Sequence, residues 1–263
     1  SVFNLTGSTV TATQTGMTLK DTTAATLDNV DVTSAGSGVV IENQTHVTLE
    51  NTVNVTAAQT AVSVAGQSTL QNNSGSGTFH TTTDGTALLV DNSTVRLTQY
   101  TFRAEGPNGC GVKATGSSTA DLSYPTGTTG KNIIWGDQDG LHIGTGSMAT
   151  VKNYHIIGST VDTEATATTG RYGARVDGTL RLDGQNTILG AQCGLYVSGG
   201  TVTNYRSGEG WTDEKTGAPA GSGTITGGKA NGADGVRIYG GKLTLGGYTV
   251  TTNDHSGLVA GQS

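Results

Sequence analysis

The chain has 263 residues, a net charge of −6 and only 13% charged residues, so no overall positive field favours nucleic acid or an anionic membrane. It contains no run of about 18 apolar residues and therefore predicts no membrane-spanning helix. The hydrophobic content of 33% and the aromatic content of 5% are low for a globular core and, taken alone, indicate disorder. No signal peptide opens the chain, so we expect Ser1 to begin a mature or trimmed protein.

A repeat overrules the indication of disorder. Residues 234–245 contain a small residue, an apolar-any-apolar triplet, a short turn and a second apolar-any-apolar triplet. The same order returns about every 22 residues, and such a period is typical of repeat architectures. The small residues that open the copies are Gly16, Gly38, Ala61, Ala87, Gly111, Gly140, Gly173, Gly194, Gly235 and Gly257. Because one series runs through the chain, we expect a single domain.

In chain order, residues 1–15 are a polar lead-in with weak alternation, which we expect to form an irregular first coil or a cap. Between residues 16 and 124 each copy holds three short strands; in the second copy these are Val39–Ile41, Val47–Leu49 and Val53–Val55. Three longer intervals are expected to be surface loops: Pro125–Gln138, Ser159–Arg171 with its Thr/Ala run Thr163–Thr169, and Arg206–Ala233. Insertions in repeat proteins often lie on the binding side.

The pattern predicts an all-β, single-domain, right-handed parallel β-helix over residues 16–263. Each strand alternates with period 2, and helical periodicity is absent. Such short strands cannot bury an apolar side alone, but stacked coils can pack their Val, Leu and Ile residues on one another. About ten three-stranded coils, spaced by about 4.8 Å, give a rod on the order of 50 Å long. The right-handed sense follows the general preference of parallel connections.

Two observations concern the end of the chain and its thiols. The sequence stops at Ser263 within a coil that residues 256–259 begin, and an open solenoid exposes a strand edge, so we expect a piece of a longer protein. Cys110 and Cys193 hold the same repeat position three coils apart, roughly 14 Å, whereas a disulfide requires Cα atoms within about 7 Å. We therefore predict two free thiols.

The middle residue of each first strand is expected to point outward. In five successive copies these outward residues are Lys113, His142, Arg175, Tyr196 and Arg237. Arginine pairs bidentately with acid groups and tyrosine stacks on sugar faces, so this stripe is a candidate site for a sulfated or carboxylated sugar chain. The alternative is an ordinary solvated β face. Trp211, in the longest predicted loop, either folds back onto the rod or projects as a contact residue.

A second outward row is mixed in character and, with other Thr-rich faces, offers hydrogen bonds for self-association. Its members are Thr48, Arg96, Asp121, Thr150, Arg181 and Thr244.

Signs of catalysis are weak. Sugar-cleaving enzymes need carboxylates about 5–9.5 Å apart, whereas Asp139 and Asp234 share a repeat position three coils, or roughly 14 Å, apart. No nucleophile, zinc or phosphate-loop motif occurs, and the five histidines lack ligand spacing. We expect no enzyme, no metal and no cofactor.

The copies at residues 139–144, 193–202 and 234–245 resemble the passenger domains of Gram-negative autotransporters of the pertactin-like kind. The resemblance covers residues 16–263 as a repeat style without a diagnostic motif, and phage tailspikes and pectin-degrading enzymes share the architecture. It implies a passenger secreted through an outer-membrane translocator barrel and displayed at the cell surface. The Arg-Gly-Asp triplet of pertactin, the translocator barrel and the Gly-Asp-Ser-Gly protease motif are all absent from this sequence.

Together these features predict a non-enzymatic surface adhesin whose partner is a host glycan, above all an acidic glycosaminoglycan, or a matrix protein. The candidate ligand-binding residues are Lys113, His142, Arg175, Tyr196, Arg237 and Trp211. One alternative is a self-associating autotransporter that promotes aggregation and biofilm, and another is a polysaccharide lyase or hydrolase.

Overall fold

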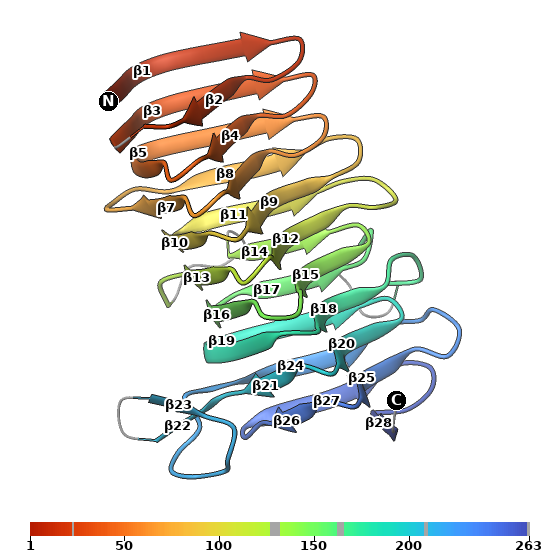
Figure 1. Ribbon diagram of the computed structural model, residues 1–263. Coiled ribbons are helices and arrows are strands. Elements are labelled where there is room, and N and C mark those ends of the chain that lie inside the picture. Colours follow the sequence, from red (N-terminus) through yellow and green to blue (C-terminus); the bar gives the residue numbers. More distant parts are fainter. Residues whose placement is uncertain (23, 127–131, 162–165, 208–209, 262–263) are drawn as a thin grey trace.

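A computed structural model describes residues 1–22, 24–126, 132–161, 166–207 and 210–261. Over these ranges the chain is all-β and contains no helix, so no helix is long and apolar enough to cross a membrane. It winds through successive layers from β1 to β28, and the two termini lie at opposite ends of the stack (Figure 1). The predicted all-β class and the parallel pairing of the strands are confirmed.

One strand of each repeat joins a ten-stranded sheet in which every neighbouring pair is parallel. In order, its strands are β2 (Met17–Lys20), β4 (Val39–Glu42), β6 (Val62–Ala65), β9 (Thr86–Asp91), β12 (Cys110–Thr115), β15 (Asp139–Ile143), β18 (Tyr172–Val176), β20 (Cys193–Ser198), β25 (Asp234–Tyr239) and β28 (Leu258–Gly261). The register is that of the sequence repeat, because each strand pairs with the next copy along the chain.

The rest of each repeat enters a sixteen-stranded sheet with two rows. The second row contains β7 (Thr69–Asn72), β10 (Thr94–Thr98), β13 (Thr119–Ser123), β16 (Met148–Lys152), β21 (Thr201–Thr203) and β26 (Lys242–Thr244). The third row contains β8 (Gly77–Thr81), β11 (Tyr100–Ala104), β14 (Ile133–Gly136), β17 (His155–Gly158), β24 (Gly221–Gly227) and β27 (Tyr248–Thr252). Long strands span both rows: β1 (Val2–Ala12), β3 (Ala24–Ser34), β5 (His46–Ala57) and β19 (Thr179–Gly190).

Several expectations about strand limits differ from the structure. The separate strands predicted at Val47–Leu49 and Val53–Val55 are one strand, β5, which turns at Asn51, a residue with φ of 52°. Asparagine tolerates this left-handed conformation, so the chain turns the corner without leaving the sheet. The lead-in at residues 1–15 contains β1, which pairs with β3 in parallel, as the strands of later repeats pair with one another.

Two predicted loops also contain strands. β14 lies within 125–138, and β24 lies within 206–233 and pairs with β19 and β27. The sequence Gly-Ser-Gly-Thr-Ile-Thr-Gly of β24 hides its strand because only Ile225 supplies an apolar side chain. The true insertion is shorter and contains a hairpin of β22 (Tyr205–Ser207) and β23 (Gly210–Thr212). Residues 163–165 of the Thr/Ala run lie outside the described residues.

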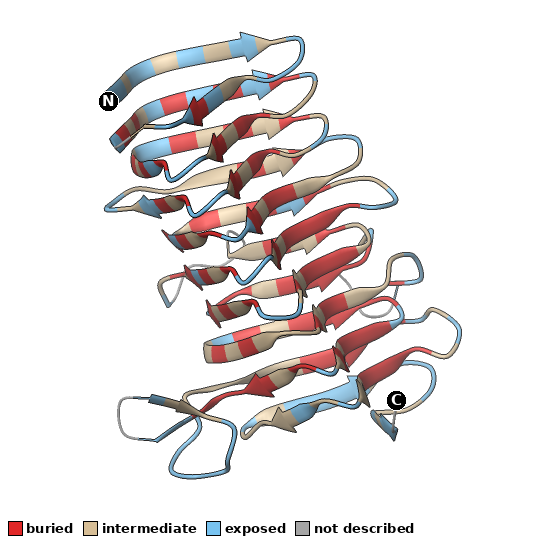
Figure 2. Ribbon diagram, viewed as in Figure 1, coloured by how far each residue is buried: buried red, intermediate tan, exposed pale blue. Residues whose placement is uncertain are grey.

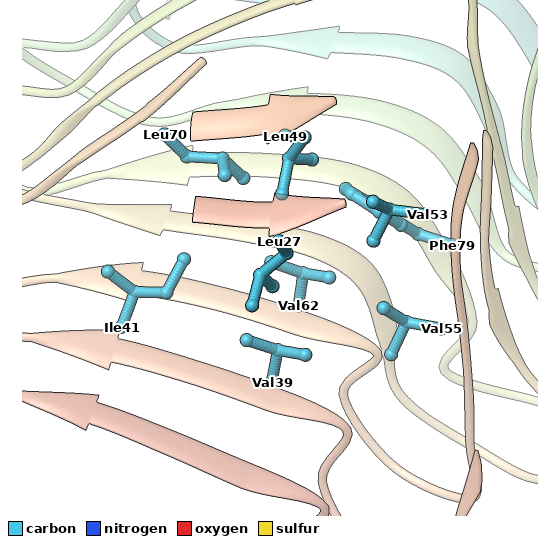
Figure 3. A pocket seen from close by; sticks show the side chains of 9 residues that line it. All are labelled: Leu27, Val39, Ile41, Leu49, Val53, Val55, Val62, Leu70 and Phe79. Atoms are coloured by element: carbon cyan, nitrogen blue, oxygen red, sulfur yellow. The ribbon is translucent and has the colours of Figure 1, made fainter. Parts of the chain in front are cut away.

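The core is a column of apolar side chains between the sheets. Residues that alternate along β9 and β12, such as Leu88, Val90 and Val112, are 0% exposed. Figure 2 shows buried residues concentrated in the middle layers and exposed ones at both ends. Near the N-terminal end nine apolar side chains surround a void of about 10 Å³ (Figure 3). It is apolar and about the size of one water, so we expect it to stay dry.

In most of the repeats that open with glycine, close packing against the next strand leaves no room for a Cβ atom, whereas Gly257, in the last repeat, has nothing within 4 Å. A Cβ atom on Gly140 would lie 2.6 Å from the carbonyl oxygen of Gly173 in the next strand, and one on Gly173 would lie 2.6 Å from that of Gly194. Ala61 and Ala87 hold the same place in earlier repeats, where a methyl group is accommodated and both residues are 0% exposed. Small residues therefore recur at the repeat spacing because the backbone of the next strand passes close to that position in most copies.

A ladder of buried hydroxyl groups lines the turn between the ten-stranded sheet and the second row. Each hydroxyl accepts the backbone N–H of the preceding member, at 3.1–3.2 Å. The ladder consists of Thr45, Ser68, Ser93, Ser118 and Ser147. It satisfies amides that the strands leave unpaired, and thereby fixes each turn to the next.

Candidate binding face on the ten-stranded sheet

The predicted stripe exists as one line of paired residues on the ten-stranded sheet. The register pairs Lys113 with His142, His142 with Arg175, Arg175 with Tyr196 and Tyr196 with Arg237. Their neighbours before and after in each strand are buried or nearly so, whereas these five are partly exposed. Four strand steps of about 4.8 Å place Lys113 and Arg237 roughly 19 Å apart.

Aspartates offset part of the positive charge of this stripe. Asp177 lies 3.0 Å from Arg175 Nε and 3.2 Å from His142 Nε2. Burial, followed by the charge of Arg175, lowers the pKa of His142 in spite of Asp177, so this ring is neutral at pH 7. Among the described residues Lys113 has no ion pair. The face therefore presents mixed donors and acceptors and is less basic than the sequence indicates.

At the other end of the stripe a buried carboxylate holds Arg237. Asp234 is 2% exposed and accepts hydrogen bonds from Arg237 Nε at 2.8 Å and from the Ser256 amide at 3.1 Å; His255 Nδ1 lies 2.8 Å away. Burial opposes the charged form, but the hydrogen bonds from His255 and Arg237 outweigh it and lower the pKa of Asp234. Arg237 is thus oriented by a fixed partner.

Tyrosines form an aromatic patch around Tyr196. The Tyr172 and Tyr196 rings stack with centroids 4.7 Å apart and an interplanar angle of 12°, and Tyr239 lies 6.2 Å from Tyr196. The guanidinium of Arg171 lies 5.0 Å from the Tyr172 ring. Sequence reasoning missed Arg171, Tyr172 and Tyr239, although Tyr172 occupies the repeat position of Cys193 and this register could have revealed it.

The position before each small residue forms a second column of this sheet. It contains Cys110, Asp139, Tyr172, Cys193 and Asp234 in successive strands. The two cysteines are therefore three strands apart, as are the two aspartates, and both predicted separations are confirmed. Both cysteines are free and buried, as predicted. Burial raises the pKa of Cys193 to about 12, which leaves this thiol protonated and unreactive. Burial likewise raises the pKa of Asp139, although Arg171 lies 3.4 Å from its carboxylate.

Trp211 lies apart from the other five predicted residues, on the β22–β23 hairpin. The ring folds back toward the second row, where Arg181 of β19 lies 5.9 Å from its centroid, and Arg206 of β22 lies 4.4 Å from it within the hairpin. The five stripe residues therefore share one face, and the sixth belongs to another. Over the described ranges, no three His, Cys, Asp or Glu residues are grouped as metal ligands.

No family model, curated protein or solved structure matches this chain. The resemblance to autotransporter passengers therefore rests on the style of the repeat.

Proposed function

We propose that the chain is a right-handed parallel β-helix that belongs to an autotransporter passenger and acts, without turnover, as a cell-surface adhesin for host sugar chains. The supporting observation is the line of Lys113, Arg175, Tyr196 and Arg237, which offers charged donors and an aromatic ring at the regular spacing of stacked strands. An extended polysaccharide repeats its hydroxyl and acid groups at comparable intervals, so successive units can bind successive coils and add their affinities.

The acid groups of such a chain would compete with Asp177 and Asp234 for the two arginines, while sugar rings pack on the tyrosines. This chemistry suits a glycan that carries both hydroxyl and sulfate or carboxylate groups, of which heparin is a convenient probe.

The test compares heparin binding of the wild type and the double variant Arg175→Ala/Arg237→Ala at two salt concentrations. We expect at least about tenfold weaker binding and a flatter salt dependence, because two charge-assisted contacts are lost. The matched control is Arg96→Ala/Arg103→Ala, which removes two arginines from the other two rows. Equal binding of wild type and stripe variant, or equal loss in both double variants, would contradict the proposal.

Self-association is a second candidate, and a column of threonines on the second row favours it. Thr69, Thr94 and Thr119 follow one another in register, and Thr179 pairs with Thr201 further along. Such a column offers repeated hydroxyl groups to an identical rod. A dimer that forms with rising concentration in sedimentation experiments, together with no retention on heparin, would favour this reading over glycan binding.

A further inference from the structure

A pocket of about 270 Å³ lies between the second row and the β22–β23 hairpin, away from the ten-stranded sheet. Its floor comes from β19 and β21, where Thr179 pairs with Thr201 and Arg181 pairs with Thr203. Its wall comes from the hairpin and the residue after it. The lining residues are Thr179, Arg181, Thr201, Thr203, Trp211, Thr212 and Asp213.

The hairpin is fixed to the body, so the pocket is a built feature. Thr203 Oγ1 donates to the Thr212 carbonyl oxygen at 2.5 Å and accepts the Tyr205 amide at 3.1 Å. Thr244 Oγ1 donates to the carbonyl oxygen of Asp213 at 2.7 Å. Tyr205, at the base of the hairpin, is 3% exposed. These contacts hold Trp211 over the second row.

The pocket is rich in hydrogen-bond donors without acceptors. Arg181 Nε is buried and has no hydrogen-bond partner, and the guanidinium has no ion pair among the described residues. The indole N–H of Trp211 and the hydroxyls of Thr179 and Thr201 also have no hydrogen bond within the described part of the chain. Leaving a buried donor unpaired is costly, and an acceptor from a ligand removes that cost.

The other charges at the pocket are already neutralised. Asp213 lies 2.8 Å from Lys242 Nζ, whose hydrogen bond lowers the pKa of that carboxyl. Arg206 lies 2.9 Å from Asp183. Arg181 is therefore the cation left to attract a ligand, and burial lowers its pKa because water is removed from the guanidinium. Arginine nevertheless stays charged in proteins, so the pocket favours an anion.

We infer that this pocket binds one acidic sugar unit, with the acid group on Arg181, ring hydroxyls on Thr179 and Thr201, and the apolar sugar face toward the Trp211 ring. Its volume is below the roughly 300–1,000 Å³ of pockets for drug-sized ligands, which suits a single sugar unit or the end of a chain. The inference takes its ligand class from the proposed function but concerns a separate site.

The experiment titrates sodium glucuronate into ¹⁵N-labelled full chain and follows the two indole N–H signals of Trp135 and Trp211. We expect a saturable shift of the Trp211 signal, identified with Trp211→Phe, while Trp135 stays unchanged. Glucose at the same concentration should leave both signals in place. Glucose 6-sulfate serves as a second acidic probe: a shift with both acids supports a general anion site, and a shift with glucuronate alone supports a carboxylate site.

Arg181→Gln should weaken glucuronate binding by about tenfold or more, because it removes a charge-assisted contact. Arg96→Gln is the matched control, since Arg96 lies in the same column three strands earlier, with Asp121 and Thr150 between. No shift with either acid, an equal shift with glucose, or equal weakening by both variants would overturn the inference. Unchanged indole signals in Arg181→Gln without ligand check that the hairpin keeps its place.

The stripe variant Arg175→Ala/Arg237→Ala separates the two proposals. It should bind glucuronate like the wild type, because the pocket lies on a different face. If the stripe variant keeps heparin binding while Arg181→Gln loses glucuronate, the binding face is wrong and the pocket stands. If instead the stripe variant loses heparin binding while Arg181→Gln still binds glucuronate, the binding face is supported and the pocket is wrong.

Discussion

Asp234 illustrates how neighbouring coils set the charge state of a residue. Its buried carboxylate gathers Arg237, His255 and the Ser256 amide from its own coil and from the one that follows. Asp139, in the same column, has a weaker partner in Arg171 at 3.4 Å, and burial raises its pKa. Folding therefore shifts the pKa values of two aspartates at one repeat position in opposite directions.

Asp234→Asn is expected to destabilise the protein at pH 7 by about 1–3 kcal/mol, because charge-assisted hydrogen bonds are lost. Folding lowers the pKa of Asp234, so its contribution is present above the unfolded pKa of about 3.9 and is lost as the pH falls through the folded value. Urea unfolding of wild type and variant from neutral pH down to about pH 2 measures this. A difference in unfolding free energy that stays constant with pH would refute it.

Asp139→Asn provides the control of opposite sign. Because folding raises the pKa of Asp139, the charged form costs stability above the folded pKa, and protonation removes that cost as the pH falls. Relative to this variant, the wild type should gain stability toward acid, whereas relative to Asp234→Asn it should lose stability.

At the scale of elements, the hydroxyl ladder adds side-chain hydrogen bonds between successive turns that backbone hydrogen bonds also join. Ser93→Ala would leave the buried amide of Ser68 without its acceptor, so we expect a loss of about 1–3 kcal/mol in unfolding free energy. Ser63→Ala is the matched control, since Ser63 lies on the outer side of β6 and is partly exposed. Thermal or urea unfolding measures both. Equal stability of the two variants would show that the ladder is not needed.

The elements also show what the sequence could predict. The repeat of small and apolar residues determined the register of the ten-stranded sheet, because alternation assigns each side chain to the core or to solvent. The ladder escaped prediction because serine before a strand is common in turns and carries no period-2 signal. The strand β24 was not predicted because glycine and threonine occupy positions that hold apolar residues in other strands. Trp211 could not be assigned to a face because hairpin placement depends on contacts distant in sequence, such as Thr244 with Asp213.

Across the whole molecule, burial changes from the ends to the middle. Val2 and Leu258 are 72% and 61% exposed, whereas the inward residues Val112, Leu141 and Leu195 are 0% exposed. Within each of the two large sheets a strand pairs with the strands before and after it in the sheet order. If the proposed β-helix is correct, its stability is the sum of repeat and interface terms. The end coils, with one neighbour, have the fewest interfaces to stabilise them.

Native-state hydrogen exchange is therefore expected to show a gradient along the ten-stranded sheet. Backbone amides of β12, β15 and β18 should exchange most slowly, and those of β1 and β28 should exchange through local opening at much lower free energy. Lys113, His142 and Arg175 then lie on the three best-protected strands, whereas Tyr196 lies on the next strand, β20, and Arg237 lies one strand from the end of the ten-stranded sheet. Rigid placement of Lys113 and Arg175 reduces the ordering cost of binding a long ligand. Equal protection of β1, β15 and β28 would instead indicate one cooperative unit, in which the ends are as rigid as the middle.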